Sequence, residues 1–497
     1  MQDRRELYGA AEVRELDRRA IEDQGIPGYV LMQRAAAAAW RVLRQRWPQA
    51  CHVVVIAGSG NNGGDGYEIA RLAQAGGCKV QVWSLGSAER GDAATARSAW
   101  QDADGAVLDW HDDASGNLHE ADVIVDAIYG TGLSRAPEAA GRRVIEAINA
   151  ARARGAGVLA VDLPSGLLAD TGAAPGVVVQ ADLTVTFIGS KLGLYTGRGP
   201  DCAGRIVFDD LDVPPAVYQN LPAQARRLEA ADLQRALPPR LRTAHKGSHG
   251  HVLIVGGDHG MMGAVLLAAR AALRAGAGLV SVATRVQHAI AITAAQAEVM
   301  AHGVESSKDL QPLLSRADVV AIGPGLGQGE WGRALWSALR EYPRRVVDAD
   351  ALNLLAQSQS TPPERSDGWI LTPHPGEAAR LLGCGTREVQ ADRPRALRDL
   401  QARYGGVPLL KGAGTLVWQD SAMAICPYGN PGMGCGGMGD VLTGVIAALW
   451  AQGLSATDAA AMGVLAHARA GDLAAEQGER GLLPSDLLSA LRDVVNP

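Results

Sequence analysis

Residues 52–66 read His52-Val53-Val54-Val55-Ile56-Ala57-Gly58-Ser59-Gly60-Asn61-Asn62-Gly63-Gly64-Asp65-Gly66. The apolar run is typical of a strand in a parallel sheet that helices cover on both faces. A helix is expected from Tyr67 onward, so the glycine-rich loop lies at a helix N-terminus. Unpaired backbone N–H groups and the helix dipole favour an anion there, and glycine lets the backbone approach it closely. The stretch therefore predicts an α/β domain that binds a phosphate-bearing ligand.

A glycine-rich turn after a strand is a weak signal by itself, since a bare Gly-x-Gly-x-x-Gly pattern also occurs without a ligand. Here two asparagines and Asp65 add amide and carboxylate oxygens, which suit a hard cation beside a phosphate. In these residues the sequence resembles the N-terminal epimerase domain of the bifunctional NAD(P)H-hydrate repair enzymes. The resemblance implies a Rossmann-like domain that binds hydrated nicotinamide dinucleotide together with a potassium ion, K⁺.

The composition indicates a globular protein of two domains. The chain has 497 residues, of which 47% are hydrophobic and 20% charged, and its formal net charge is -6. This mild negative charge gives no basic footprint for nucleic acid or an anionic membrane. No apolar stretch reaches the about 20 residues of a membrane span, and the N-terminus lacks an apolar signal-peptide core. We therefore expect a cytoplasmic protein that binds neither nucleic acid nor membranes.

The six cysteines are scattered along the chain without a Cys-x-x-Cys pair. This spacing argues against structural zinc and against a disulfide framework, so most are expected to be small buried hydrophobic residues. Only Cys435 lies in a predicted active-site loop, and no base is visibly paired with it. We expect no nucleophilic cysteine.

Prolines interrupt the pattern of strands and helices between about Leu211 and Arg240. We expect one α/β domain over 1–215, a Pro-rich linker over 216–240 and a second α/β domain over 241–497. Before the linker, apolar strands alternate with helical segments, and the alternation restarts at His251. The expected strands of the first domain, besides the opening one, are Lys79–Trp83, Asp122–Ala127, Gly157–Asp162 and Leu183–Ile188, with a helix over Glu138–Arg152.

An amphipathic segment from about Ala10 to Arg46 precedes the first strand. We interpret it as a packing or dimerisation element rather than as part of a catalytic site, and we expect a homo-oligomer. Within it, Gln33 departs from the epimerase pattern, in which related proteins commonly carry a glutamate. We interpret this difference as a change on the helix surface.

Polar residues stand where two further strands of the first domain end. Val123-Ile124-Val125-Asp126 ends on a carboxylate, and Val158-Leu159-Ala160-Val161-Asp162 leads into Leu163-Pro164-Ser165. Each residue alone could be a helix cap. Ligands of open α/β sheets bind at the carboxyl ends of strands, so Asp126, Asp162 and Ser165 are expected to converge on the first loop.

Matched to the epimerase pattern, these residues take separate roles. The resemblance implies that Asp162 is the acid–base residue and that Asn62, Asp126 and Ser165 bind K⁺, as oxygen-only ligation allows. It implies that the hydrate contacts Asp162 and two loops, made of Asn61, Asn62, Gly63, Gly64 and Asp65, and of Gly130, Thr131, Gly132, Leu133, Ser134, Arg135 and Ala136.

The implied substrate has a hydroxyl on the carbon beside the nicotinamide ring nitrogen. Protonating this hydroxyl expels water and leaves a ring cation that the nitrogen stabilises. Water that returns to the opposite face inverts the centre and interconverts the R and S hydrates. Asp162 could serve both proton transfers, an effect usually worth about 10²–10⁴-fold.

The second domain carries Asn430-Pro431-Gly432-Met433-Gly434-Cys435-Gly436-Gly437-Met438-Gly439-Asp440 at the start of an apolar helix. The glycines free backbone N–H groups to surround a transferring phosphoryl group, and the helix N-terminus adds positive potential. Asp440 is placed to take a proton from an attacking hydroxyl. This Gly-x-Gly-Asp arrangement resembles the ribokinase-like fold.

Further motifs complete the pattern in the second domain, namely Gly256–Ala264, Gly323–Gly327, Leu371–Glu377 and Lys411–Thr415. Together they resemble the ADP- or ATP-dependent NAD(P)H-hydrate dehydratases. The resemblance implies that the hydrate contacts Ala264, Gly325, His374 and Asp440. It also implies that the nucleotide contacts Lys411, Gly412, Ala413, Gly414, Thr415 and Gly439.

Hydroxide is a poor leaving group, so phosphorylating the ring hydroxyl and then eliminating phosphate would lower the barrier to dehydration of the S hydrate. Phosphoryl transfer normally needs Mg²⁺, which nucleotide and water can largely hold. We expect ADP as donor, giving AMP and phosphate, because the bacterial relatives generally resemble ADP users. ATP stays possible, since no residue separates the two by a physical argument.

Two alternatives remain from the sequence. Ribokinase-like sites often stop at phosphorylation, so the chain could be a small-alcohol or vitamin kinase with an accessory domain. The N-terminal domain could instead be a non-catalytic ligand-binding module or scaffold.

Overall fold

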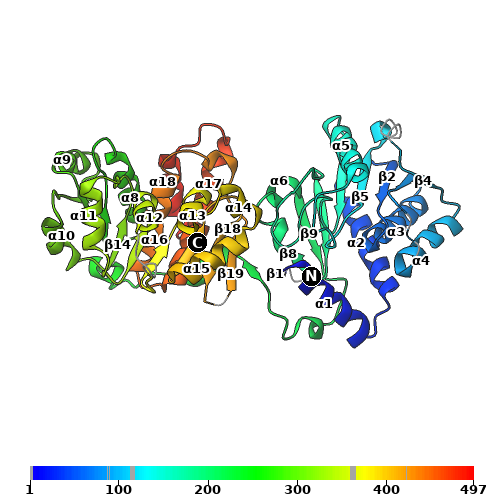
Figure 1. Ribbon diagram of the computed structural model, residues 1–497, viewed down its shortest axis with the longest axis horizontal. Helices are drawn as coiled ribbons and strands as arrows, with labels where there is room; N and C mark the ends of the chain where they lie inside the picture. The colour runs from blue at the N-terminus through cyan, green and yellow to red at the C-terminus, as the bar shows by residue number, and fades with distance from the viewer. Residues whose placement is uncertain are drawn as a thin grey trace. The chain divides into compact units, whose positions relative to one another are not determined.

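The computed structural model describes residues 4–86, 88, 90–111, 118–358, 365–420 and 422–496. The chain divides into two compact units, Met1–Arg226 and Arg227–Pro497 (Figure 1). The segment 216–240, where we expected a linker, contains part of the short helix η4 (Pro215–Tyr218), the strand β10 (Ala225–Arg227) and the helix α7 (Ala230–Ala236).

The first unit is built on a parallel sheet with the strand order β4-β3-β2-β5-β6-β7-β9. Side chains of β2 point alternately to the two faces: Val53 and Val55 pack with α2, α3 and α4, while Val54 and Ile56 pack with α5. This two-sided burial explains the apolar run with which the domain begins. The elements are β2 (His52–Ala57), β3 (Lys79–Ser84), β4 (Val107–Asp109), β5 (Val123–Ala127), β6 (Gly157–Val161), β7 (Leu183–Phe187), β9 (Arg205–Asp209), α2 (Gly28–Arg46), α3 (Asn61–Ala75), α4 (Gly91–Asp102) and α5 (Ala139–Ala153).

The helix after β2 begins at Asn61, six residues before the position that we predicted. Its glycines oppose a helix by propensity, but they permit close packing. A Cβ atom on Gly66 would lie 2.7 Å from the Cβ of Ala127, and one on Gly63 would lie 2.0 Å from the carbonyl oxygen of Gly58. The glycine-rich segment is therefore mostly the first turns of a helix pressed against the sheet.

The N-terminal segment forms more than one element. A small sheet pairs β1 (Glu6–Tyr8) with β8 (Ser190–Lys191) in parallel and with β10 antiparallel. The helices α1 (Ala10–Arg18) and η1 (Arg19–Asp23) follow β1. The short sheet thereby brings α1 and Lys191, far apart in sequence, to the same part of the first unit.

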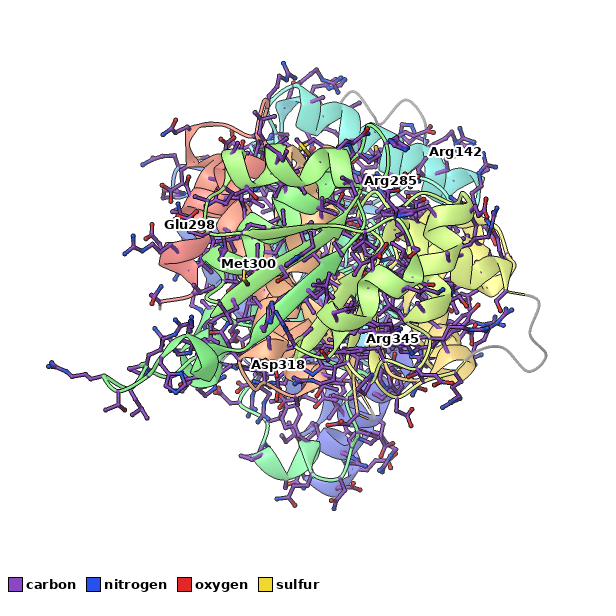
Figure 2. The ribbon with its side chains drawn as sticks, turned by 90° about the vertical axis from the view of Figure 1, so that its left-hand side faces the viewer. Arg142, Arg285, Glu298, Met300, Asp318 and Arg345 are labelled. Atoms are coloured by element: carbon purple, nitrogen blue, oxygen red, sulfur yellow. The ribbon has the colours of Figure 1, made fainter. Side chains whose placement is uncertain are left out.

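The second unit holds the strand order β13-β12-β11-β14-β15-β16-β17-β18-β19, parallel from β13 to β17 and antiparallel beyond. In Figure 2, Arg285, directly after β12, marks the carboxyl ends of these parallel strands, and Asp318, directly before β14, marks their amino ends. The strands are β11 (His251–Val255), β12 (Leu279–Thr284), β13 (Met300–Gly303), β14 (Val319–Ile322), β15 (Arg345–Val347), β16 (Trp369–Leu371), β17 (Val407–Leu410), β18 (Thr415–Gln419) and β19 (Ala422–Cys426).

The helices of the second unit include a nearly wholly buried one, α16 (Met438–Ala451), which packs in the core with α8 (Met262–Arg274), α17 (Ala456–Ala474) and α18 (Pro484–Val494). Their apolar side chains and those on one face of the sheet form one cluster. The remaining helices are α9 (Val286–Ala295), α10 (Ser307–Leu314), α11 (Glu330–Ala338), α12 (Ala349–Gln357), α13 (Pro375–Leu382), α14 (Thr386–Ala391) and α15 (Arg393–Tyr404).

The structure bears on two expectations drawn from composition, one about membrane spans and one about the cysteines. Within the described ranges, no helix combines the length and apolar character needed to cross a membrane. All six cysteines are free thiols, but only Cys202 and Cys426 are buried, while Cys51 and Cys435 are exposed. The expectation that most cysteines are buried was wrong, because several lie at strand ends and in loops.

The close contact between α16 and α8 makes a prediction about stability. Replacing Gly444 by Ala should raise helix propensity by about 1 kcal/mol. However, the new Cβ would lie 2.1 Å from the carbonyl oxygen of Ala268. We expect the steric clash to outweigh the gain in helix propensity and to destabilise the second unit by about 1–3 kcal/mol. Differential scanning calorimetry of the full chain measures this, with Gly329→Ala, where a Cβ meets nothing within 4 Å, as control. An unchanged or raised melting temperature for Gly444→Ala would contradict the packing.

Candidate active sites

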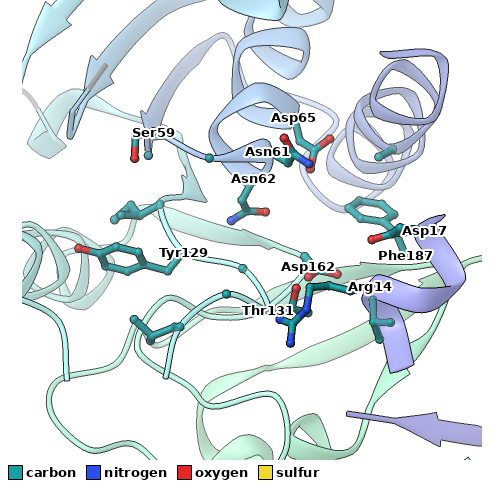
Figure 3. A pocket seen from close by; sticks show the side chains of 18 of the residues that line it. Arg14, Asp17, Ser59, Asn61, Asn62, Asp65, Tyr129, Thr131, Asp162 and Phe187 are labelled. Carbon is teal, nitrogen blue, oxygen red and sulfur yellow. The ribbon is translucent and has the colours of Figure 1, made fainter. Parts of the chain in front are cut away.

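A cavity of about 910 Å³ opens at the carboxyl ends of β2, β5 and β6 in the first unit (Figure 3). The strand order runs in opposite directions from β2 and β5, so this is the switch point at which open α/β sheets bind ligands. Both predicted loops and the predicted acid–base residue reach the cavity. Its lining includes Asn61, Asn62, Asp65, Gly130, Thr131, Gly132, Leu133, Ser134, Arg135, Ala136 and Asp162.

Four of the predicted residues do not line the cavity. Gly63 and Gly64 lie behind its wall, where Gly63 packs on the backbone of Gly58 and Gly64 on the side chain of Met32. Their position assigns them to helix packing rather than to a wall of the site. Asp126 and Ser165 are also behind the wall, and both are fully buried.

Asp126 and Ser165 form one hydrogen-bonded pair. The Ser165 hydroxyl donates to Asp126 Oδ1 at 2.6 Å, and the Ser165 backbone N–H donates to Oδ2 at 2.8 Å. The Ser165 oxygen also accepts from the Tyr129 backbone N–H at 2.9 Å. Burial raises the pKa of Asp126 to about 6, even though these hydrogen bonds lower it. A buried carboxylate with only neutral partners favours a nearby cation.

The Asn62 side chain has unsatisfied polar atoms. It is 9% exposed, and neither its Oδ1 nor its Nδ2 has a hydrogen-bond partner. A Cβ on Gly130 would lie 3.5 Å from Asn62 Cγ and 3.5 Å from Asp162 Oδ2, so these three residues meet at one place. An orphaned amide that faces a cavity indicates a ligand there, because unpaired buried polar atoms are costly.

Asp162 is held in an unusual conformation and paired with a lysine. Its φ of 69° is in the left-handed region, which Asp tolerates better than most residues. The ammonium group of Lys191 donates to Asp162 Oδ1, to Thr186 Oγ1 at 3.1 Å and to the Phe187 carbonyl at 3.0 Å. Lys191 was not among the residues predicted from the sequence, although it closely follows the buried strand β7 (Leu183–Phe187).

Two further carboxyl groups face the same cavity. Asp17 comes from α1 and Asp65 from α3. Burial raises the pKa of Asp17 to about 6, with Lys191 opposing and Asp162 adding to the shift. Burial, with help from Asp162 and Asp17, raises the pKa of Asp65 well above its usual range. The expectation that the Ala10–Arg46 segment serves only packing or assembly was therefore incomplete, because α1 supplies part of the wall.

Gln33 lies on α2 and is partly buried. It does not line the cavity, although Leu31, Met32 and Ala35 of the same helix do. The residue that departs from the epimerase pattern is thus outside the wall of the site.

The second unit assembles a site at the carboxyl ends of β15, β16 and β17. Asp348, which directly follows β15, is 1% exposed and accepts three hydrogen bonds. They come from Thr372 Oγ1 at 2.7 Å, Lys411 Nζ at 2.8 Å and Thr443 Oγ1 at 2.8 Å. Burial alone would raise the pKa of Asp348, but the Lys411 ammonium and these bonds hold it below its usual range. The sequence analysis did not single out Asp348.

Lys411 joins Asp348 to the predicted Pro-His-Pro turn. Its ammonium lies 3.8 Å from Glu377 Oε2, and this carboxylate accepts from the His374 backbone N–H at 2.8 Å. The ring of His374 caps α13 by accepting from the Gly376 N–H at 3.0 Å. Burial and the charge of Lys411 lower the pKa of His374, so the ring stays neutral at neutral pH. The capping role fixes Nδ1 as an acceptor, and the other ring nitrogen, Nε2, lies 3.5 Å from Glu377 Oε1.

Asp440 stands in the first turn of α16 beside this network. A Cβ on Gly439 would lie 3.3 Å from Lys411 Nζ and 3.6 Å from Asp348 Oδ2. Burial and the Asp348 carboxylate raise the pKa of Asp440 to about 7, while Lys411 opposes the shift. A carboxylate that titrates near neutral pH is suited to take a proton from a hydroxyl.

The remaining predicted residues fall into two groups. Gly325 has a φ of 56°, and a Cβ there would lie 3.3 Å from Ala264, so the two predicted hydrate contacts are adjacent. Lys411 begins the turn between β17 and β18. The other predicted nucleotide contacts follow it, with Gly412, Ala413 and Gly414 in the turn and Thr415 at the start of β18.

Known proteins match both units in the same order. The family model described as YjeF-related protein N-terminus matches residues 28–193, and the model described as NAD(P)H-hydrate dehydratase matches residues 252–493. The bifunctional NAD(P)H-hydrate repair enzyme Nnr of Coxiella burnetii is 48% identical over 496 residues, which cover 99% of each chain. The Escherichia coli enzyme of the same name is 45% identical over 500 residues, covering 99% of this chain and 94% of that protein.

A solved structure matches the second unit. The crystal structure of a ribokinase-like superfamily protein from Enterococcus faecalis aligns with a TM-score of 0.51 and 28% identity. The alignment covers 56% of this chain and 98% of that chain. The predicted α/β class, with a Rossmann-like and a ribokinase-like unit, is thereby confirmed.

The raised pKa of Asp440 predicts a stability effect of known sign. The folded state keeps its proton up to about pH 7, whereas the ordinary value is 3.8, so ionisation destabilises the fold as pH rises between them. Asp440→Asn removes this effect. We expect it to stabilise the protein by about 1–3 kcal/mol more at pH 8 than at pH 5, at about 1.4 kcal/mol per pKa unit. Calorimetry at pH 5 and pH 8 measures the change in unfolding free energy, and Asp493→Asn, at an exposed position, is the control. An equal stabilisation by Asp440→Asn at the two pH values would refute the raised pKa of Asp440.

Proposed function

The chain belongs to the bifunctional NAD(P)H-hydrate repair enzymes, and we propose that its two sites perform the two activities with the residues described above. The cavity of the first unit epimerises the R and S hydrates of NADH and NADPH. The Asp440 site of the second unit dehydrates the S hydrate. The observation that carries this assignment is that each unit places a carboxyl group suited to proton transfer at the ligand-binding edge of its sheet.

In the first unit, Asp162 is the acid–base residue of the epimerisation. It lines the cavity between the Asn61–Asp65 turn and the Gly130–Ala136 loop. The N-terminus of α3 faces the same space, so its free N–H groups favour the pyrophosphate of the ligand. Lys191 holds the Asp162 side chain in place, so the carboxylate is oriented before the hydrate binds.

In the second unit, Asp440 removes the proton from the ring hydroxyl as a phosphoryl group is transferred to it. The glycines before α16 supply backbone N–H donors for the phosphoryl oxygens. Lys411 adds a positive charge next to Gly439. Elimination of phosphate from the phosphorylated hydrate then restores the reduced nicotinamide.

The phosphoryl donor is ADP, which leaves as AMP, and ATP is the competing candidate. Its phosphates would lie near Lys411 and Gly439, with the remaining contacts on the Gly412–Thr415 turn. The carboxylates Asp348 and Glu377 lie beside Lys411. Mg²⁺ would neutralise phosphate charge there, held mainly by nucleotide and water.

K⁺ belongs to the first site, with Asn62, Asp126 and Ser165 as ligands. The orphaned amide of Asn62 and the buried carboxylate of Asp126, whose hydrogen-bond partners are all neutral, fit a cation that takes oxygen ligands. Over the part of the chain that the structure describes, no group of three or more His, Cys, Asp or Glu side chains could hold a metal ion. An amide, one carboxylate and one hydroxyl suit a singly charged cation better than a transition metal.

Variants that inactivate one site each test the division of labour. Wild-type protein with both epimers of hydrated NADH, ADP, Mg²⁺ and K⁺ should recover all reduced-nicotinamide absorbance. Asp162→Asn should stop at the share of the S epimer on the time scale of the wild-type reaction. Asp440→Asn should recover none, because it lacks the base for phosphoryl transfer.

Mixing the two variants provides the control. If each fails at only one site, the mixture restores complete recovery, since the epimers diffuse between molecules. Parallel reactions with ATP identify the donor. Accumulation of a stable phosphorylated product without absorbance recovery would favour the kinase alternative. Recovery by the wild-type protein that stops at the share of the S epimer, as with Asp162→Asn, would favour the scaffold alternative.

Exchange of the monovalent cation tests the K⁺ ligands. Replacing K⁺ by Li⁺ at constant ionic strength should slow epimerisation of the R hydrate while leaving dehydration of pure S hydrate unchanged. Asn62→Ala should raise the K⁺ concentration for half-maximal epimerisation by about 10–100-fold. Asn149→Ala, on α5 away from the cavity, is the control. Equal epimerase rates in both salts would exclude this site.

A further inference from the structure

Three carboxyl groups and one ammonium group surround the inner part of the first-unit cavity. Asp17, Asp65 and Asp162 line it together with Lys191. In the view of Figure 3, Asp65 lies on one side of the space and Asp162 on the other. The orphaned amide of Asn62, which also lines the cavity, marks the same place as a ligand site.

Of the three carboxyl groups, Lys191 donates a hydrogen bond to that of Asp162. Its three N–H donors are used by Asp162, Thr186 and the Phe187 carbonyl. The side chain of Asp65 has no hydrogen bond or ion pair among the described residues. Lys191 therefore pairs with Asp162, while Asp65, which faces two other carboxyl groups, favours its protonated form.

The other charged groups around Asp65 do not change this division. Glu68, on the same helix, accepts from Tyr29 at 2.6 Å and from Arg71 at 2.8 Å. Arg135 on the second loop pairs with Glu138 at 2.8 Å. The remaining charged residues of the lining are Arg14 on α1 and Asp92 on α4.

Inversion of the hydrate requires proton transfer on both faces of the nicotinamide ring. Water must leave from one face and return to the other, and the backbone strand end that carries Asp162 is fixed on one side of the cavity. Sites of this kind use two titratable groups whose environments favour opposite protonation states. In the first unit the environments of the two carboxyl groups differ, because Asp162 has an ammonium partner and Asp65 lies among carboxyl groups.

We propose that Asp65 is a second acid–base residue of the epimerase site, acting on the ring face opposite to Asp162. This inference rests on the proposed epimerase function of the first unit. In one direction, the Asp65 carboxyl gives its proton to the ring hydroxyl, and the carbon–oxygen bond breaks as water leaves. The ring nitrogen donates its lone pair to form a carbon–nitrogen double bond. Water then adds to the opposite face, Asp162 takes one of its protons, and the electron pair returns to nitrogen.

After this half-cycle Asp65 is ionised and Asp162 is protonated. The reverse conversion starts from that state, with the two residues exchanging roles. The pair therefore serves both directions, and proton exchange with water resets it.

Asp65→Asn tests the proposal. The assay supplies purified R hydrate, ADP, Mg²⁺ and K⁺, with excess Asp162→Asn protein as the dehydratase, so the rate of absorbance recovery reports epimerisation. We expect kcat to fall about 10²–10⁴-fold with KM changed less than about threefold, since the amide keeps the shape but cannot exchange a proton. Asp65→Glu should restore part of the activity. Asp102→Asn, exposed at the end of α4, is the matched control and should behave as wild type.

The pH profile separates catalysis from a structural role. Wild-type epimerisation should fall at high pH as Asp65 loses its proton, and the residual rate of Asp65→Asn should lack this fall. Asp17→Asn should move the fall to lower pH, because it removes a negative charge that raises the pKa of Asp65. An unchanged kcat in Asp65→Asn, or a loss expressed only in KM with the wild-type pH profile, would overturn the proposal. If the wild-type protein itself fails to convert R hydrate, the epimerase function fails instead.

Discussion

Each unit depends on a lysine buried against a carboxylate at the carboxyl edge of a parallel sheet. Lys191 pairs with Asp162 in the first unit, and Lys411 pairs with Asp348 in the second. Such a pair contributes little net stability when complete, but losing one partner leaves a costly unpaired charge. The sheets can therefore hold charge at their ligand-binding edges only while both partners are present, and the surrounding hydroxyl groups of Thr186, Thr372 and Thr443 complete the same arrangement.

The two sites use the lysine differently. In the first unit the lysine contacts Asp162, the residue that we propose reacts, so it fixes the direction of that side chain. In the second unit the lysine touches Asp348, and Asp440 stands beside the pair without a hydrogen bond to it. The negative charge of Asp348 then disfavours ionisation of Asp440, whereas Lys411 moderates the effect. A lysine–carboxylate pair thus includes the reacting carboxyl group in the first unit, whereas in the second unit it stands beside a carboxyl group with a raised pKa.

The sequence predicted the parts that follow from local rules. The spacing of apolar residues predicted the parallel sheets. The rule that ligands bind at the carboxyl ends of strands pointed to Asp126, Asp162 and Ser165. The sequence could not predict the start of α3, because close packing on the sheet overrides the low helix propensity of its glycines. Lys191 and Asp348 were missed for a related reason: their significance lies in partners that are 29 and 63 residues away. Asp17 was missed because an amphipathic helix alone does not reveal which sheet edge it will reach.

The left-handed backbone of Asp162 restricts how this protein can change over evolutionary time. Besides glycine, aspartate and asparagine are the residues that most readily adopt such a conformation. Residue 162 therefore has to adopt a left-handed backbone conformation and also carry a carboxyl group for proton transfer, and aspartate is the residue that does both. A descendant that abandoned the first reaction but kept the fold would be expected to carry Asn or Gly at this position, and would retain the cavity as a binding site without turnover.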